Sequence, residues 1–363
     1  MTMKLTPDDT NTIFLALAGS QAHGTSHKGS DVDLRGICVA PLEIRLSLFH
    51  KFEQYEGAIP PRLYDETTTA LKQHPTASSC IDTKVEVVIF DIAKFMALCA
   101  ATNPNALEIL FTDPRDWIIA SQTWEKLYRH RHRFLTQRVQ ATFCGYAVAQ
   151  LKKIKSHRSW LLNPPGKKPT REEFGLPSRS TIGHDDRIRI EQGIAEHVRT
   201  AEEEDAEKRH QRKDEEGNSA VRDQAIEEIG LTDEVVSTLK KEKRYRAALK
   251  HWQSYQSWEK NRNPARAKLE HRFGYDTKHA THLVRLLRMG REVLASNNLI
   301  IRRPDAEELI AIRNGALTFD QLLQTVDVLQ KEIDVLSDQC TLPNDVDCDF
   351  VDRLLFELIS DQH

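Results

Sequence analysis

The sequence predicts an α+β protein, with a small mixed-sheet core followed by a larger helical region. Three observations support this prediction. Residues 13–18 and 84–90 are short, mainly apolar runs, as expected of buried strands. Beyond Pro114 the apolar residues recur with helical spacing. Residues 181–265 are dominated by Glu, Lys, Arg and Gln, which favours exposed helices there.

Composition limits the class of protein. A chain of 363 residues is long enough for two domains, each with its own core. No run approaches the roughly 18 apolar residues of a membrane span, and the six scattered cysteines form no close pair. We therefore expect a cytoplasmic protein with reduced thiols and no membrane segment. The net charge of −3 gives no global basic field for nucleic acid, and the oligomeric state stays open.

Shifts in composition divide the chain into four expected segments. The core is followed by a helical extension with a Pro-rich loop, then by a charged helical insertion, and finally by a C-terminal helical domain. Their expected bounds are residues 1–115, 116–180, 181–265 and 266–363.

The first strand is expected to end at Gly19. A glycine there lets the backbone approach a ligand closely, and the N–H groups of the following turn can point at phosphate oxygens. The Ser20 hydroxyl is a further donor. Gly19-Ser20 is therefore a candidate phosphate-binding turn, although such a pair alone is common in ordinary turns.

A second pattern follows ten residues later, in Asp31-Val32-Asp33-Leu34-Arg35. Alternate residues of a strand share one face, so the Asp31 and Asp33 carboxylates point the same way, together with Arg35. Two like charges about 4 Å apart repel by roughly 4 kcal/mol at an effective dielectric near 20, which favours a bound cation. Mg²⁺ is the natural candidate because it prefers carboxylate, water and phosphate oxygens.

A third carboxylate is expected from the strand at residues 84–90. Glu86 is the acid inside this run of Val, Ile and Phe, and an unpaired acid in such a place is costly. Completion of the metal site would explain it, and a salt bridge to a buried arginine is the alternative. Asp82 and Asp91 flank the run and are second choices.

A cationic stripe is predicted further along. Lys278, His282 and Arg285 have i, i+4, i+7 spacing, opposite an apolar stripe on the same expected helix. This stripe either faces the ligand cleft and meets phosphate or is a solvated helix face. His279 and His282 are also three residues apart, but no acid or cysteine completes a metal site with them, so zinc is not predicted there.

Aromatic and basic residues alternate between residues 241 and 262, including Tyr245, Trp252, Tyr255 and Trp258. Such interleaving can bind single-stranded nucleic acid. Helical periodicity explains most of these aromatics as packing residues, which is the favoured interpretation.

The pattern of Gly19-Ser20, ten residues and Asp31-x-Asp33 resembles the nucleotidyltransferases of the DNA polymerase β superfamily. It is especially similar to a branch of predicted bacterial and phage nucleotidyltransferases. The resemblance covers the first 180 residues and roughly residues 270–330, and the stretch between them looks like an insertion. Further similar segments are Asn103-Pro104-Asn105-Ala106-Leu107-Glu108, Asn163-Pro164-Pro165, Phe174-Gly175-Leu176-Pro177, the run 278–287 and Arg303-Pro304-Asp305.

The resemblance implies transfer of a nucleoside monophosphate from a nucleoside triphosphate such as ATP to an acceptor hydroxyl, with release of pyrophosphate. Asp31, Asp33 and Glu86 would be the catalytic residues and would hold two Mg²⁺ ions, with Mn²⁺ as an alternative. The nucleotide would be bound by a second set, namely Gly19, Ser20, Arg35, Lys278, His282 and Arg285.

The acceptor stays open among an RNA 3′ end, a protein and a small molecule. The alternative function is a catalytically silent module that binds a nucleotide or a partner, of the toxin–antitoxin or phage-defence type.

Overall fold

The computed structural model describes residues 11–80, 84–179, 192 and 233–362. The chain forms two compact units. The first combines Met1–Leu161 with Ala265–His363, and the second is Leu162–Pro264. The features predicted at residues 202–219 lie outside the described residues.

The first unit contains a five-stranded mixed sheet of strand order β3-β4-β2-β1-β5. β2 and β4 are parallel, and the other neighbours are antiparallel. The strands are β1 (Asn11–Leu17), β2 (Val32–Val39), β3 (Gln54–Gly57), β4 (Val85–Asp91) and β5 (Trp117–Ala120). The sheet and the helices after it confirm the predicted α+β class. β5 lies beyond residue 115, where the core was expected to end.

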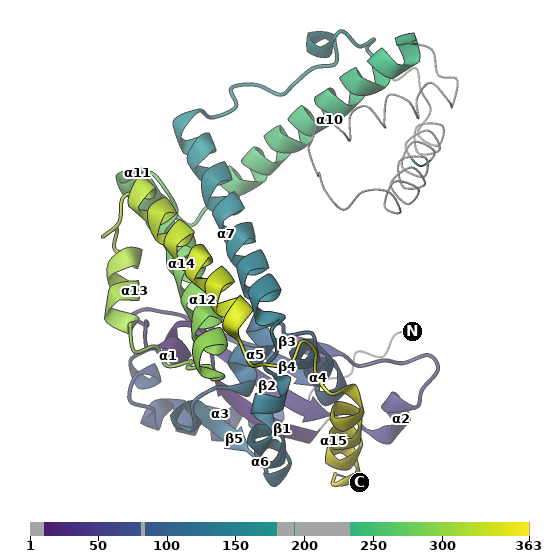
Figure 1. Cartoon of the computed structure of the whole chain (residues 1–363), viewed down its shortest axis with the longest axis vertical. Helices are drawn as coiled ribbons and strands as arrows, with labels where there is room; N and C mark the ends of the chain where they lie inside the picture. The colour runs from purple at the N-terminus through teal and green to yellow at the C-terminus, as the bar shows by residue number, and fades with distance from the viewer. Residues whose placement is uncertain (1–10, 81–83, 180–191, 193–232, 363) are drawn as a thin grey trace. The chain divides into compact units, whose positions relative to one another are not determined.

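Helices make up most of the rest (Figure 1). The α-helices of the first unit before the insertion are α1 (Gly19–His23), α2 (Leu42–Arg45), α3 (Tyr64–Gln73), α4 (Ile92–Ala100), α5 (Pro104–Leu110), α6 (Gln122–Arg129) and α7 (Val139–Leu162), which ends at the unit boundary. Those after it are α11 (Pro264–Phe273), α12 (Thr277–Ser296), α13 (Ala306–Arg313), α14 (Phe319–Gln339) and α15 (Cys348–Ser360). Short 3₁₀ helices are η2 (Pro61–Leu63), η3 (Ala77–Cys80), η4 (Pro114–Asp116) and η5 (Arg131–Phe134).

Strand alternation places two apolar cores on the two faces of the sheet. On β2, Leu34 packs in a core with residues of α3, whereas Ile37 packs in a core with residues of α4, α6 and α15. At the start of the same strand, Asp33 and Arg35 are only half-buried, although they share the face of Ile37. The polar end of β2 is therefore where this face opens to solvent.

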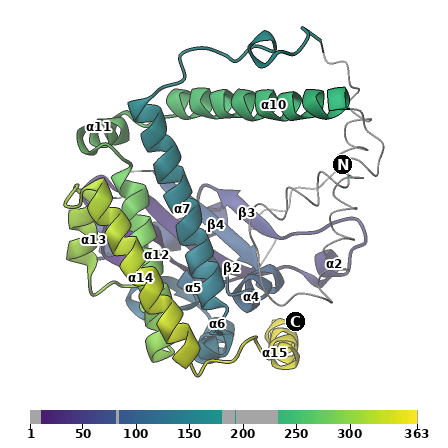
Figure 2. The same cartoon turned by 45° about the horizontal axis from the view of Figure 1, so that its top comes forward.

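The C-terminal helices form a second layer of the same unit. α12 and α14 lie side by side in both views (Figures 1 and 2). α12 also approaches α7 closely, because a Cβ on Gly290 would lie 3.1 Å from Cβ of Phe143. A shared apolar core that includes Ala147, Leu283 and Leu322 joins the three helices. In this way α12 is fixed against helices on either side of the insertion.

The second unit contains η6 (Glu172–Phe174) and the long helix α10 (Asp233–Lys260). Arg171 pairs with the buried Glu242, and the Phe174 and Tyr245 rings meet edge to face with centroids 5.8 Å apart. Tyr245 thus has the packing role that its helical spacing predicts. Among the described residues, no helix is both long and apolar enough to cross a membrane.

Candidate active site

The predicted turn at Gly19-Ser20 follows β1 after a single residue, Ala18, and forms the start of α1. Gly19 has φ of +57°, a conformation that residues with a Cβ rarely adopt. A Cβ there would lie 2.6 Å from Oδ2 of Asp33. The Ala18 N–H also donates to the Asp33 carbonyl oxygen at 2.8 Å. The glycine therefore lets this turn lie directly against the Asp33 carboxylate.

Asp33 and Glu86 are neighbours across the sheet. In the parallel register of β2 and β4, Asp33 is the partner of Glu86, and Arg35 is the partner of Val88. Residues paired in this way point to the same face, so the two carboxylates share a face with Arg35. Asp31 lies exposed, one residue before β2. All three acids thus gather at one end of the central strand pair.

The surroundings of Asp33 raise its pKa. Burial is the largest cause, and the charges of Glu86 and Asp31 act in the same direction. The cations Arg35 and Lys278 oppose the rise, and Nη2 of Arg35 lies 3.8 Å from Oδ1 of Asp33. Lys278, on α12, is therefore close enough to influence the acid group although it is distant in sequence.

Glu86 is more than half exposed and pairs with Lys84. This hydrogen bond and charge lower the pKa of the Glu86 carboxyl. Elsewhere in the described part of the chain, ligand atoms of three side chains lie within 4.8 Å of one another. The carboxylate oxygens of Asp31, Asp33 and Glu86 do not all lie that close together. The structure therefore aligns the backbones of Asp33 and Glu86 while Lys84 holds the Glu86 carboxylate.

Asp91 and Asp82 are the second choices for the third carboxylate of the metal site. Asp91 caps α4 by accepting the Ala93 N–H, and it pairs with Arg45 at 2.6 Å. These contacts give Asp91 a structural role. Asp82 lies outside the described residues.

Of the three predicted nucleotide-binding residues on α12, Lys278 is exposed, whereas Arg285 is buried. Nη1 of Arg285 lies 2.6 Å from Oε1 of Glu108, and Nη2 donates to Nδ1 of His282 at 2.8 Å. His23 completes the group, with Nε2 3.2 Å from Oε2 of Glu108. Arg285 and His282 are thus engaged in a buried network, which we call the Glu108 network (His23, Glu108, His282 and Arg285).

The Glu108 network joins three segments that resemble the predicted nucleotidyltransferases described in the sequence analysis. Glu108 ends the Asn-Pro-Asn-Ala-Leu-Glu segment on α5, His23 ends α1, and Arg285 lies on α12. Sequence reasoning gave Glu108 no role. The sequence did contain one signal for Glu108. It is an acid at the end of an apolar helical segment, and an acid that is buried needs a partner.

The groups of the Glu108 network shift one another's pKa. Burial opposes ionisation of Glu108, but Arg285 and His23 outweigh it and hold the pKa of Glu108 far below its usual range. Burial and the Arg285 charge lower the pKa of His282 to about 4 and also lower that of His23. Both imidazoles are therefore neutral at neutral pH, and the network is one carboxylate held by one guanidinium.

Hydrogen bonds also connect α1 to residues 301–303, which follow α12. The Arg303 N–H donates to the His23 carbonyl oxygen at 3.1 Å, and Nδ1 of His23 lies 3.3 Å from the Ile301 carbonyl oxygen. The Arg303 side chain in turn pairs with Glu292 and Asp305. The turn beside the acids is thus supported by residues from the end of the chain.

Residues 5–161 match the family model described as "RNA repair pathway DNA polymerase beta family". This segment belongs to the polymerase β-like nucleotidyltransferase superfamily. The match includes the five strands of the nucleotidyltransferase sheet, the Gly19 turn, the three acids and Glu108. Comparisons with curated proteins and with solved structures gave no match.

The acid group of this nucleotidyltransferase segment fits a hard divalent cation. Its donors are carboxylate oxygens, which Mg²⁺ and Mn²⁺ prefer. Mutual repulsion contributes to the raised pKa of Asp33, so a cation would be stabilised there. Gly19 leaves open the space beside Asp33 that a Cβ would fill.

Proposed function

We propose that this protein is a Mg²⁺-dependent nucleotidyltransferase that moves a nucleoside monophosphate from a nucleoside triphosphate to an acceptor hydroxyl and releases pyrophosphate. The observation that carries the proposal is the register of Asp33 and Glu86 on adjacent parallel strands, beside the Gly19 turn. The family match of residues 5–161 supports the general class of reaction.

In this proposal Asp31 and Asp33 would hold the metal, and Glu86 would be the third ligand, on the acceptor side. When bound, Mg²⁺ supplies positive charge that stabilises the attacking and leaving oxygens of the transferred phosphoryl group. Glu86 would then exchange its contact with Lys84 for the metal. The backbone of Glu86 is already opposite Asp33, so this exchange calls for a new rotamer of the Glu86 side chain.

The nucleotide is held by the remaining residues of the site. The N–H groups of Gly19 and Ser20 and the Ser20 hydroxyl are donors for the terminal phosphates. Arg35 balances the charge of Asp33 and can reach a phosphate oxygen from the same face. Lys278 is the exposed cation on α12 whose charge reaches Asp33, so we assign it to the triphosphate.

His282 and Arg285 have a different role in this proposal. Arg285 is engaged by Glu108, and the neutral His282 accepts from Arg285. We therefore assign both to positioning: they fix α12, and with it Lys278, against α1 and α5.

We further propose RNA as the class of acceptor. The support is the description of the matched family, which places it in an RNA repair pathway. A protein acceptor remains an outcome of the test below.

The test incubates the purified full chain with each α-³²P-labelled nucleoside triphosphate and Mg²⁺, with total RNA and total protein in separate reactions. We expect label on RNA with the native chain and none with Asp31→Asn/Asp33→Asn or Glu86→Gln. Asp327→Asn, which changes an exposed acid on α14, is the matched control and should label RNA like the native chain.

Label on protein alone would overturn the RNA assignment while supporting nucleotidyl transfer. Absence of label from both reactions, together with nucleotide binding that the acid variants do not weaken, would instead support a silent binding module.

A further inference from the structure

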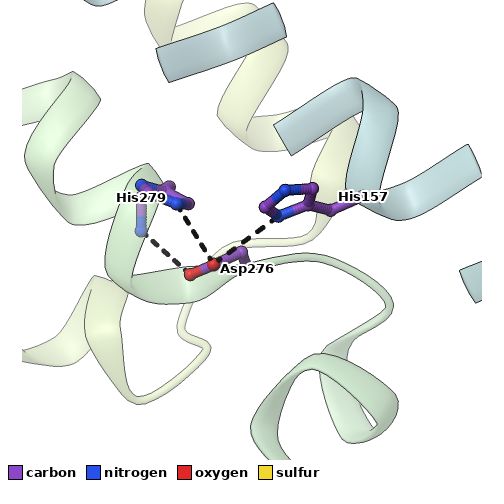
Figure 3. A group of neighbouring side chains, drawn as sticks. All are labelled: His157, Asp276 and His279. Atoms are coloured by element: carbon purple, nitrogen blue, oxygen red, sulfur yellow. Dashed lines mark hydrogen bonds and ion pairs between the residues drawn. The ribbon is translucent and has the colours of Figure 1, made fainter. Parts of the chain in front are cut away.

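A second group of metal-ligand side chains lies at the start of α12. It consists of His157 on α7 together with Asp276 and His279, and the ligand atoms of all three lie within 4.8 Å of one another (Figure 3). Nε2 of His279 lies 3.5 Å and Nδ1 of His157 lies 4.0 Å from Oδ2 of Asp276. The sequence did not predict this group, because His157 comes from a distant helix.

We propose that His157, Asp276 and His279 bind a divalent transition-metal ion of the Zn²⁺ class, which clamps α7 to the first turn of α12. Two ligand atoms each about 2.1 Å from a tetrahedral ion lie about 3.4 Å apart. The observed separations from Asp276 of 3.5 and 4.0 Å are close to this value. Small side-chain movements would therefore form the site.

The donor set separates this ion from the one proposed at the acids. Two imidazole nitrogens and one carboxylate oxygen suit Zn²⁺, Co²⁺ or Ni²⁺, whereas Mg²⁺ prefers oxygen ligands alone. Imidazole binds these metals through a ring nitrogen, and each histidine has a ring nitrogen within 4.0 Å of the Asp276 carboxylate.

The surroundings of Asp276 hold its carboxylate in place. Asp276 is the N-cap of α12, and its Oδ1 accepts the His279 N–H at 3.0 Å. Nη2 of Arg266 lies 3.0 Å from Oδ2 and competes with a metal for the charge. On metal binding Arg266 would become the outer partner of a carboxylate ligand, an arrangement common at metal sites.

A metal ion from solvent can reach this group at the two histidines, which are partly exposed. About one-fifth of each histidine side chain is exposed, 18% for His157 and 21% for His279, whereas Asp276 is 1% exposed. The carboxylate is thus buried, whereas an ion from solvent can reach both imidazoles. Lys278 lies between the ligands Asp276 and His279, so the clamp would also fix the backbone that presents Lys278.

The test measures binding of Co²⁺ and Zn²⁺ to the full chain without nucleotide. All titrations use an Asp31→Asn/Asp33→Asn background, so that the acid group does not take up the ion. We expect one equivalent of Co²⁺ to give visible d–d absorption without intense thiolate charge-transfer bands, and Zn²⁺ to displace it. Loss of outer partners alone changes metal affinity about 10–100-fold, so His157→Asn or His279→Asn should weaken binding by at least about 100-fold.

His271→Asn, on the neighbouring helix α11, changes an exposed histidine outside the group and should bind Co²⁺ as the background chain does. Circular dichroism of each variant establishes that it is folded. No Co²⁺ binding by a folded background chain, or equal binding by the His157 and His279 variants, would overturn the proposal. Because the assay contains no nucleotide, its result is independent of whether the protein transfers nucleotides.

Discussion

Asp33 of β2 and Glu86 of β4 are register partners in a parallel strand pair, although β3 and α3 lie between them in the chain. A shift of one residue in this register would send Glu86 to the opposite face of the sheet. The apolar partners Leu34 and Val87 in the next position pack in one core, which opposes such a shift. Burial of neighbouring residues thus fixes the alignment of the two acids.

The pairing of Glu86 with Lys84 leads to the first prediction. Glu86→Gln should abolish nucleotidyl transfer, whereas Lys84→Met should retain it and lower the Mg²⁺ concentration that gives half-maximal activity by a few-fold. The reason is that Lys84 competes with the metal for the same carboxylate. Mg²⁺ titration of the transfer rate measures both effects. An increased Mg²⁺ requirement in Lys84→Met would contradict this role of Lys84.

Gly19→Ala should reduce the transfer rate by about 10-fold or more, because each loss of about 1.4 kcal/mol of transition-state stabilisation lowers a rate tenfold. The added Cβ would displace the Asp33 carboxylate, whose Oδ2 would lie only 2.6 Å away. Gly29→Ala is the matched control, since Gly29 also has positive φ but its Cβ would meet nothing within 4 Å. Equal rates for the two variants would show that the contact with Asp33 has no role.

Removal of the Glu108 charge should destabilise the fold. Glu108→Gln leaves Arg285 buried without its carboxylate, and breaking a buried pair in this way costs about 3–5 kcal/mol. Urea unfolding monitored by tryptophan fluorescence measures the change in the free energy of unfolding. Addition of Arg285→Met should restore part of the loss, because it removes the unpaired charge. Glu125→Gln, at an exposed position on α6, should have little effect.

The free energy of unfolding should fall as the pH is lowered from 7.5 to 5. Burial and Arg285 lower the folded-state pKa of His282 from 6.5 to about 4, with Glu108 opposing and His23 and His279 adding to the shift. The unfolded chain therefore binds more protons than the folded chain between these pKa values, and protons favour unfolding. For His282 alone the loss at pH 5 is at most about 2 kcal/mol. His282→Gln should reduce the pH dependence of urea unfolding, and an unchanged dependence would contradict a buried neutral His282.

The sequence alone predicted the fold class and the strands that carry the acids, because their signals are local. Gly19 ends an apolar run, and Asp31 and Asp33 flank a single valine. Alternation places Asp33 and Arg35 on one face without knowledge of any partner strand. The roles of these residues in catalysis stay predictions.

The Glu108 network could not be predicted in the same way, because it depends on long-range packing. The helical stripe of Lys278, His282 and Arg285 gave the correct helix, but it does not say which cation is exposed. That depends on the approach of α5, which places Glu108 beside Arg285. The histidine group had a partial signal, since Asp276 precedes His279 by three residues, but His157 on α7 was required to complete it.

The two-part construction of the first unit has a consequence for the order of folding during synthesis. The core beneath the acids contains Phe95 and Trp124 from the first part of the chain and Met289 and Leu354 from the last. A ribosome completes the strands that carry Asp33 and Glu86 before it makes the helices that finish their core. Until then the nascent chain exposes apolar surface that only its own later residues can cover, so chaperones that bind such surface should associate with it before release.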